Sequence, residues 1–202
     1  MAFDFPVILL AAGGSTRMAG RDKLMEQVDG IPLLERQAAR ARAATTGPVL
    51  VALPPRPHPR YDAVAGLGVT CLSVAEAAEG MNASLRTAVA ALPPGAACAM
   101  VLLADLPDID TADLITVGAA VDPTTSVRVW RGATQDGRPG HPIVFHADLF
   151  PAFAGLSGDG GGKEVVALAG EHVRLVPLPD DRARRDLDTP ADWAAWRETR
   201  AK

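Results

Sequence analysis

Hydrophobic residues in this chain recur in short runs separated by polar, glycine-containing or proline-containing segments. Most of these runs have the length of a strand and end at Gly, Pro or Asp. The predicted strands are residues 7–12, 49–53, 69–74, 99–104, 127–130, 143–145 and 173–178. Segments with helical patterning alternate with them, at residues 33–44, 82–92, 112–121, 147–153, 163–169 and 191–199. This alternation predicts an α/β fold, with a Rossmann-like mixed, mainly parallel sheet and helices on both faces.

Composition narrows the class of protein. The chain has 202 residues, of which 48% are hydrophobic and 22% charged, so we expect a single globular domain over residues 1–202. A net charge of −4 argues against a broad basic surface for nucleic acid. No apolar run is long enough to cross a membrane, and the first residues lack the pattern of a secretory signal. Cys71 and Cys98 form no CxxC pair and lie in apolar runs. We therefore expect reduced thiols and a cytoplasmic protein.

Three polar segments directly follow predicted strands, namely residues 13–23, 105–108 and 186–188. Ligands of parallel α/β sheets bind beyond the carboxyl ends of the strands. We therefore expect these three segments to meet at one rim of the sheet.

The first of these segments, the glycine loop (residues 13–23), has the composition of an anion site. Its glycines allow a tight turn with backbone N–H groups close to a ligand. Arg17 offers a fork for phosphate oxygens, and Lys23 offers a point charge. Neither a GxGxxG fingerprint nor a P-loop is present, and "SGDGGGKE" at residues 157–164 also fails the P-loop pattern. A solvated turn with incidental cations is the structural alternative.

Asp105 ends an apolar strand, where an unpaired carboxylate is costly unless a cation accompanies it. This favours a hard divalent metal such as Mg²⁺, although a turn-initiating Asp is the alternative. Asp186 and Asp188 alternate along an extended segment, so we expect only one of them to face the metal. Asp188 is equally suited to cap the helix that follows it.

Several stretches together resemble a known family. The opening "LAAGGSTRM…K", followed by "AEGMNASLRTAV", "VLLADLPDID", "GRPGHPIVF" and "DLDTPADW", resembles the MobA-like nucleotidyltransferases over nearly the whole chain. These have a glycosyltransferase-A type nucleotide-binding fold. The family includes the molybdenum cofactor cytidylyltransferases and guanylyltransferases.

The resemblance implies roles for individual residues. It implies that the reaction moves a nucleoside monophosphate onto a phosphorylated acceptor and releases pyrophosphate, with Arg17, Lys23 and Asp105 as the catalytic residues. The residues implied in nucleotide binding are Leu10, Ala11, Ala12, Gly13, Gly14, Ser15, Arg17, Lys23, Gly80, Met81, Asn82 and Ser84. The implied metal ligands are Asp105, Asp188 and Asp186, and the implied acceptor-binding residues are Gly140, His141 and Lys163. The structural alternative for Asn82 and Ser84 is that they only open a helix, and His141 suits an orienting hydrogen bond better than a base.

The choice of nucleotide is less sharply marked. The residues Leu10–Gly13 match the cytidylyl-type opening, which favours CTP, with molybdopterin as the acceptor and a molybdoenzyme as a possible recipient of the product. The spacing between Arg17 and Lys23 instead resembles the guanylyl type, which keeps GTP as the alternative. An oxidoreductase that binds a nicotinamide nucleotide and a cofactor-carrier protein are further alternatives on the same fold.

Overall fold

The computed structural model describes residues 1–200, which build a seven-stranded sheet of order β5-β4-β1-β6-β8-β7-β9. Its strands are β1 (Val7–Leu10), β4 (Val49–Leu53), β5 (Thr70–Ser73), β6 (Cys98–Leu103), β7 (Val129–Ala133), β8 (Pro139–His146) and β9 (Val173–Pro177). β8 runs antiparallel to β6 and β7, and the other neighbouring strands are parallel. The short strands β2 (Gln27–Val28) and β3 (Ile31–Pro32) form a separate antiparallel pair. The predicted mixed, mainly parallel sheet is confirmed.

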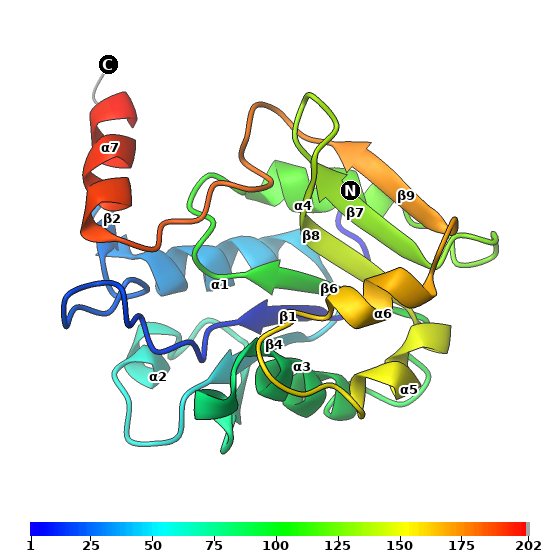
Figure 1. Cartoon of the computed structure of the whole chain (residues 1–202), viewed down its shortest axis with the longest axis horizontal. Coiled ribbons are helices and arrows are strands. Elements are labelled where there is room, and N and C mark those ends of the chain that lie inside the picture. Colours follow the sequence, from blue (N-terminus) through cyan, green and yellow to red (C-terminus); the bar gives the residue numbers. More distant parts are fainter. Residues whose placement is uncertain (201–202) are drawn as a thin grey trace.

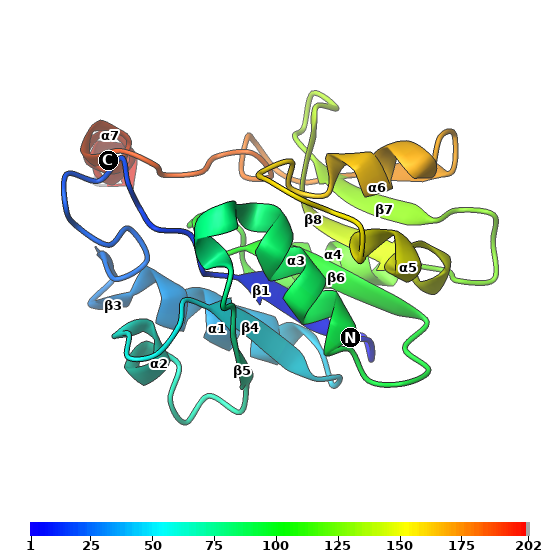
Figure 2. The same cartoon turned by 60° about the horizontal axis from the view of Figure 1, so that its bottom comes forward.

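Helices cover both faces of this sheet, as predicted. They are α1 (Leu33–Ala44), α2 (Arg60–Ala63), α3 (Met81–Ala90), α4 (Thr111–Ala119), α5 (Phe150–Phe153), α6 (Lys163–Leu168) and α7 (Pro190–Arg200), with 3₁₀ turns η1 (Ala77–Glu79) and η2 (Ala147–Leu149). In Figure 2, α3 and α5 lie in front of the sheet and α4 lies behind it. The segment predicted as one helix at residues 147–153 divides into η2 and α5. The short helix α2 was not predicted.

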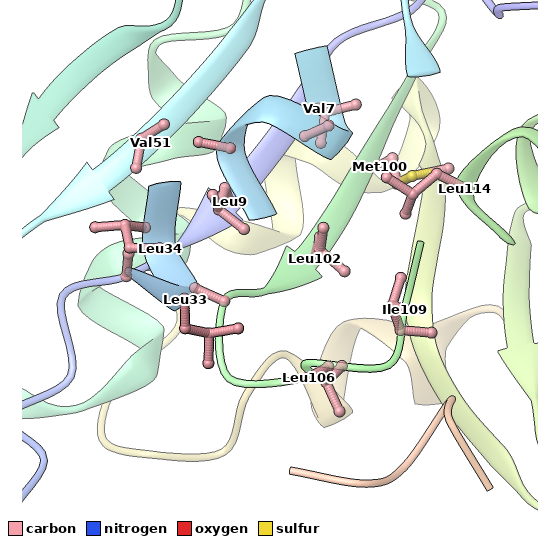
Figure 3. Packing of buried hydrophobic residues seen from close by; sticks show 14 of the residues in the cluster. Val7, Leu9, Leu33, Leu34, Val51, Met100, Leu102, Leu106, Ile109 and Leu114 are labelled. Atoms are coloured by element: carbon pink, nitrogen blue, oxygen red, sulfur yellow. The ribbon is translucent and has the colours of Figure 1, made fainter. Parts of the chain in front are cut away.

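β1 shows how the core is divided between the two faces. Its four residues are all buried, because a central parallel strand is covered on both sides. Val7 and Leu9 point into one core cluster, where they pack with Leu33 and other apolar residues of α1 (Figure 3). Ile8, the residue between them, belongs to the opposite cluster, with α3 and α5. This alternation along β1 fixes the strand between two helical layers.

The segment that follows β6 is held in place from α1. Gln37, which is fully buried, donates its side-chain amide to the carbonyl oxygen of Leu106. Arg40 donates to the carbonyl oxygens of Pro107 and Ile109, at 2.9 and 2.7 Å. These hydrogen bonds fix the turn that carries Asp105.

The parallel strands β1, β4 and β6 end at the same edge of the sheet, and Figure 1 shows the loops after β1 and β6 leaving it together. Leu187 N donates to Asp105 O at 3.2 Å, which brings the segment before α7 to the same edge. The predicted convergence of the three polar segments is therefore present. Across residues 1–200, no helix combines the length and the apolar character needed to cross a membrane.

Candidate active site

A cleft with a volume of about 520 Å³ opens at this edge of the sheet. It is lined by the end of β1, by the glycine loop, by η1 and the start of α3, and by three acidic side chains. The lining residues are Leu10, Ala11, Ala12, Gly13, Gly14, Ser15, Thr16, Arg17, Lys23, Leu24, Ala77, Ala78, Gly80, Met81, Ser84, Leu103, Asp105, Asp159 and Asp188. Most of the residues implied in nucleotide binding thus share one cleft, although they come from two segments, residues 10–23 and 80–84, that are far apart in the sequence.

A chain of ion pairs crosses the floor of the cleft. Lys23 Nζ lies 2.5 Å from Asp105 Oδ2 and 2.6 Å from Asp188 Oδ1. Arg17 Nη2 lies 2.7 Å from Asp188 Oδ2. The side chains of Lys23 and Asp105 are only 13% and 17% exposed, whereas that of Arg17 is 67% exposed. The two cations therefore contact the carboxylates in this structure, and Arg17 has the freedom to reach a ligand in the open part of the cleft.

Burial and charge shift the pKa values of this cluster in opposite directions. Burial disfavours the charge of Lys23, but the Asp105 and Asp188 carboxylates outweigh burial and raise the pKa of Lys23. Burial alone would raise the pKa of Asp188, but the hydrogen bond and charge of Lys23 lower it. Burial, together with the neighbouring carboxylates of Asp188 and Asp105, raises the pKa of Asp186. The cluster thus stabilises the charged forms of Lys23 and Asp188 and disfavours the ionised form of Asp186.

The acidic residues fit a divalent metal that shares its ligands with phosphate. Asp105 Oδ1 is buried and has no hydrogen-bond partner, so one lone-pair face of this carboxylate lacks a donor. Across residues 1–200, no three His, Cys, Asp or Glu side chains are arranged to hold a metal ion by themselves. Mg²⁺ is commonly bound through one or two carboxylates plus substrate phosphates, and Asp105 and Asp188 supply such a pair. Of Asp186 and Asp188, of which only one was expected to face the metal, Asp188 lines the cleft and Asp186 does not.

The part of the cleft around α3 differs from the expectation at one residue. Ser84, Gly80 and Met81 line the cleft, but Asn82 lies behind it with no exposed surface. Asn82 Nδ2 donates to Ser157 O at 2.6 Å, and its Oδ1 accepts from Gly162 N at 3.1 Å. Because both ends of this amide are used, Asn82 anchors the segment 157–162 rather than facing a ligand. In this structure the side chain of Asn82 therefore does not face the cleft, unlike those of its neighbours Met81 and Ser84.

Gly80 has a structural reason to be glycine. Its φ is +128°, and a Cβ at this position would lie 2.7 Å from the carbonyl oxygen of Gly158. The segment that Asn82 anchors therefore packs directly on the start of α3. This contact also brings Asp159 into the wall of the cleft, where its Oδ1 accepts from Met81 N at 2.8 Å.

The three residues implied in acceptor binding lie outside the residues that line the cleft. Gly140 is buried in β8, where a Cβ would lie 2.2 Å from Ala183 O, and His141 N donates to the same oxygen at 2.7 Å. Burial, aided by the charge of Arg131, lowers the pKa of His141 to about 4, so this imidazole is neutral at neutral pH. Lys163 is exposed at the start of α6. Gly140 and His141 thus hold β8 to the segment before α7, and a role in acceptor binding stays a prediction.

Sequence reasoning missed two residues of the site. Asp159 belongs to a glycine-rich stretch that does not match the P-loop pattern, and nothing local in the sequence distinguishes it. Arg60 lies just after the proline-rich segment 54–59, which sequence analysis would treat as a connection. In the structure its guanidinium is buried directly behind the glycine loop. An arginine without helical or strand patterning around it gives no signal of such a position.

The sheet order together with a cleft lined by cations and carboxylates is the arrangement expected of a nucleotidyltransferase. A family model described as a MobA-like NTP transferase domain matches residues 7–175, and the chain belongs to this family. No curated protein matches the chain.

Solved structures share this architecture over almost the whole chain. Rv0371c from Mycobacterium tuberculosis H37Rv is 26% identical, with a TM-score of 0.76, over 96% of this chain and 98% of that chain. A complex of Rv0371c with manganese gives 24% identity and a TM-score of 0.77, over 97% of this chain and 99% of that one. A CMP:2-keto-3-deoxy-manno-octonic acid synthetase complexed with CTP is 18% identical, with a TM-score of 0.70, over 98% of this chain and 99% of that one.

Proposed function

We propose that this nucleotidyltransferase uses Mg²⁺ to transfer CMP from CTP to a phosphorylated acceptor, molybdopterin, with release of pyrophosphate. The observation that carries the proposal is the meeting of Arg17, Lys23, Asp105 and Asp188 in one cleft. These residues come from three segments that are far apart in the sequence and close only in the fold. A triphosphate needs both cations and a metal, and this cleft offers two cations beside two carboxylates.

The residues of the cleft have separable tasks in this reaction. Backbone amides of the glycine loop and the Arg17 guanidinium would hold the phosphate oxygens of CTP. Asp105 and Asp188 would hold the metal, which supplies charge neutralisation for the phosphates and the leaving pyrophosphate. Lys23 lies between the two carboxylates. When phosphate oxygens replace these carboxylates as partners of the ammonium, Lys23 would stabilise the negative charge on the phosphates. No protein base is needed, because an acceptor phosphate is already ionised at neutral pH.

CTP is favoured by the residues Leu10–Gly13, and GTP is the second candidate, favoured by the spacing of Arg17 and Lys23. The CTP complex of a protein with the same fold supports a cytidine nucleotide as the first to test. Asp159 adds a further argument, because a carboxylate accepts hydrogen bonds but cannot donate them. It would accept from the exocyclic amino group of cytosine, adenine or guanine, which uracil lacks, and would therefore disfavour UTP.

The direct test compares the melting temperature of the protein in the presence of Mg²⁺ and each of the four ribonucleoside triphosphates, measured by thermal unfolding. We expect CTP to raise the melting temperature most, and Asp105→Asn to remove the part of this gain that depends on Mg²⁺. The acceptor is then tested by pyrophosphate release from CTP with molybdopterin. Stabilisation by NADPH in place of any triphosphate would contradict the proposal.

A further inference from the structure

Arg60 lies directly behind the glycine loop and is the only arginine or lysine side chain within residues 1–200 that is buried. It occupies the first position of α2, and its side chain is 2% exposed. Arginine is rarely buried to this extent unless its donors find acceptors, because removing an unpaired charge from water is costly. The contacts of Arg60 therefore indicate what its burial serves.

The guanidinium joins the beginning and the end of the glycine loop. Its Nη1 donates to Ala11 O at 2.6 Å and to Gly13 O at 2.8 Å. Its Nε and Nη2 donate to the two carboxylate oxygens of Asp22, at 2.8 and 2.7 Å, and Nη2 also reaches Ser15 Oγ at 3.2 Å. One side chain thus fixes two backbone carbonyls, a hydroxyl and a carboxylate within residues 11–22.

The two carbonyl contacts determine which way the neighbouring amides point. In a planar trans peptide unit, the C=O of one residue and the N–H of the next point in opposite directions. Because Arg60 holds the carbonyls of Ala11 and Gly13, the N–H groups of Ala12 and Gly14 are directed away from Arg60. Both residues line the cleft, and within residues 1–200 neither amide donates to a protein acceptor. These donors are therefore oriented and free for an anion.

Asp22 completes this arrangement without adding charge to the cleft. Burial opposes the ionised form of Asp22, but the hydrogen bonds and charge of Arg60 outweigh it and lower the pKa of Asp22. The pair is thus neutral overall. Asp22 Oδ1 also accepts from Leu24 N at 3.0 Å, and Ser15 Oγ accepts from Lys23 N at 3.2 Å. The same contacts therefore place the residue that carries the Lys23 ammonium.

We propose that Arg60 is a positioning residue for the phosphates of the nucleotide. It holds the glycine loop so that the amides of Ala12 and Gly14 face the triphosphate, and it does not contact the nucleotide itself. This inference rests on the proposed function, since it requires that the cleft binds a polyphosphate.

The test is the affinity of the whole protein for tripolyphosphate, which has no base and needs no acceptor. Arg60→Lys keeps the positive charge but cannot reach Asp22, Ala11 and Gly13 together. We expect this variant to bind tripolyphosphate roughly ten- to a hundredfold more weakly, as expected when oriented donors to a charged ligand are lost. In steady-state assays the KM for CTP should rise by a similar factor, with a smaller change in kcat.

Two further variants separate positioning from general stability. Val117→Ala removes part of a fully buried side chain on α4, remote from the cleft, and should lower the melting temperature without weakening tripolyphosphate binding. Asp22→Asn serves as the test if Arg60→Lys does not fold. This variant keeps Arg60 but weakens its hydrogen bonds to residue 22, so we expect it to bind tripolyphosphate more weakly than the wild type, by less than tenfold. Low concentrations of guanidinium should partly restore binding to Arg60→Ala.

The outcomes distinguish this inference from the function on which it rests. Wild-type affinity for tripolyphosphate in Arg60→Lys, or an equal loss in Val117→Ala, would overturn the positioning role and leave the proposed function intact. A wild-type protein that binds neither tripolyphosphate nor any nucleoside triphosphate would overturn both.

Discussion

Replacing Lys23 by methionine tests how the floor of the cleft balances its charges. Methionine retains most of the aliphatic stem of Lys23 and removes only the ammonium, which lies 2.5 and 2.6 Å from Asp105 and Asp188. The remaining carboxylates then face one another without a buried cation. We expect this variant to be less stable than the wild type in the absence of divalent metal.

The size of the effect follows from the burial of the pair. Removing one partner of a buried ion pair costs about 3–5 kcal/mol. Side-chain exposures of 13% and 17% place this cluster near the lower end, about 3 kcal/mol. For a chain of this length each kcal/mol lowers the melting temperature by roughly 2–4 °C, so we expect a loss of about 6–12 °C.

Magnesium should reverse this loss. Without Lys23 between them, Asp105 and Asp188 are free to bind the metal, so Lys23→Met should bind Mg²⁺ more tightly than the wild type does. At a hundred times its Kd, a ligand adds about 2.7 kcal/mol of stability, which nearly offsets the loss. The assay is thermal unfolding over a series of Mg²⁺ concentrations, with turnover expected to fall because Lys23 no longer stabilises the phosphates.

Arg128→Met is the matched control, because it removes a cation from the partly exposed ion pair with Asp148, outside the cleft. We expect a change of less than about 1 kcal/mol and no increase in the Mg²⁺ effect. If Lys23→Met and the wild type have the same stability and the same response to Mg²⁺, the assignment of Asp105 and Asp188 to the metal is wrong.

Three further outcomes are expected. Gly140→Ala should lower the free energy of unfolding by about 1–3 kcal/mol in chemical denaturation, because its Cβ would meet Ala183 O; unchanged stability would contradict the packing described for β8. Asp159→Asn should reduce discrimination between CTP and UTP in binding assays, since an amide can also donate; an unchanged ratio would exclude Asp159 from base recognition. Lys23 lowers the pKa of Asp188, so the stability that this ion pair adds to the fold is present above about pH 3.9 and is lost as the pH falls through the lowered pKa of Asp188. If Lys23→Met loses stability on acidification to the same extent as the wild type, the pairing is contradicted.

The hydrophobic pattern was enough to predict the centre of the sheet, because β1, β4 and β6 are short, continuous apolar runs. Val7–Leu10 shows this most clearly, since both of its faces are buried. The antiparallel direction of β8 has no such signature, because apolar runs in either direction look alike. Helix α2 has four residues and no period that a pattern could reveal.

The cleft was predictable to the extent that strand ends carry its charges. Arg17, Lys23, Asp105 and Asp188 all follow a predicted strand or precede a predicted helix, and the structure places them together. Asn82 shows the limit, because a polar residue at the start of a helix can face either the ligand or the protein. Its burial depends on the segment 157–162, about 80 residues further along the chain, which only tertiary contacts reveal.

The central claim is that Asp105 and Asp188 hold a metal beside a triphosphate bound by the glycine loop. A crystal structure of the protein with CTP and Mn²⁺, examined by anomalous scattering, tests it most directly. We expect an anomalous peak within bonding distance of both carboxylates and of phosphate oxygens, with the amides of Ala12 and Gly14 on the triphosphate. A peak elsewhere, or a triphosphate that leaves Arg17 and Lys23 without phosphate contacts, would contradict it.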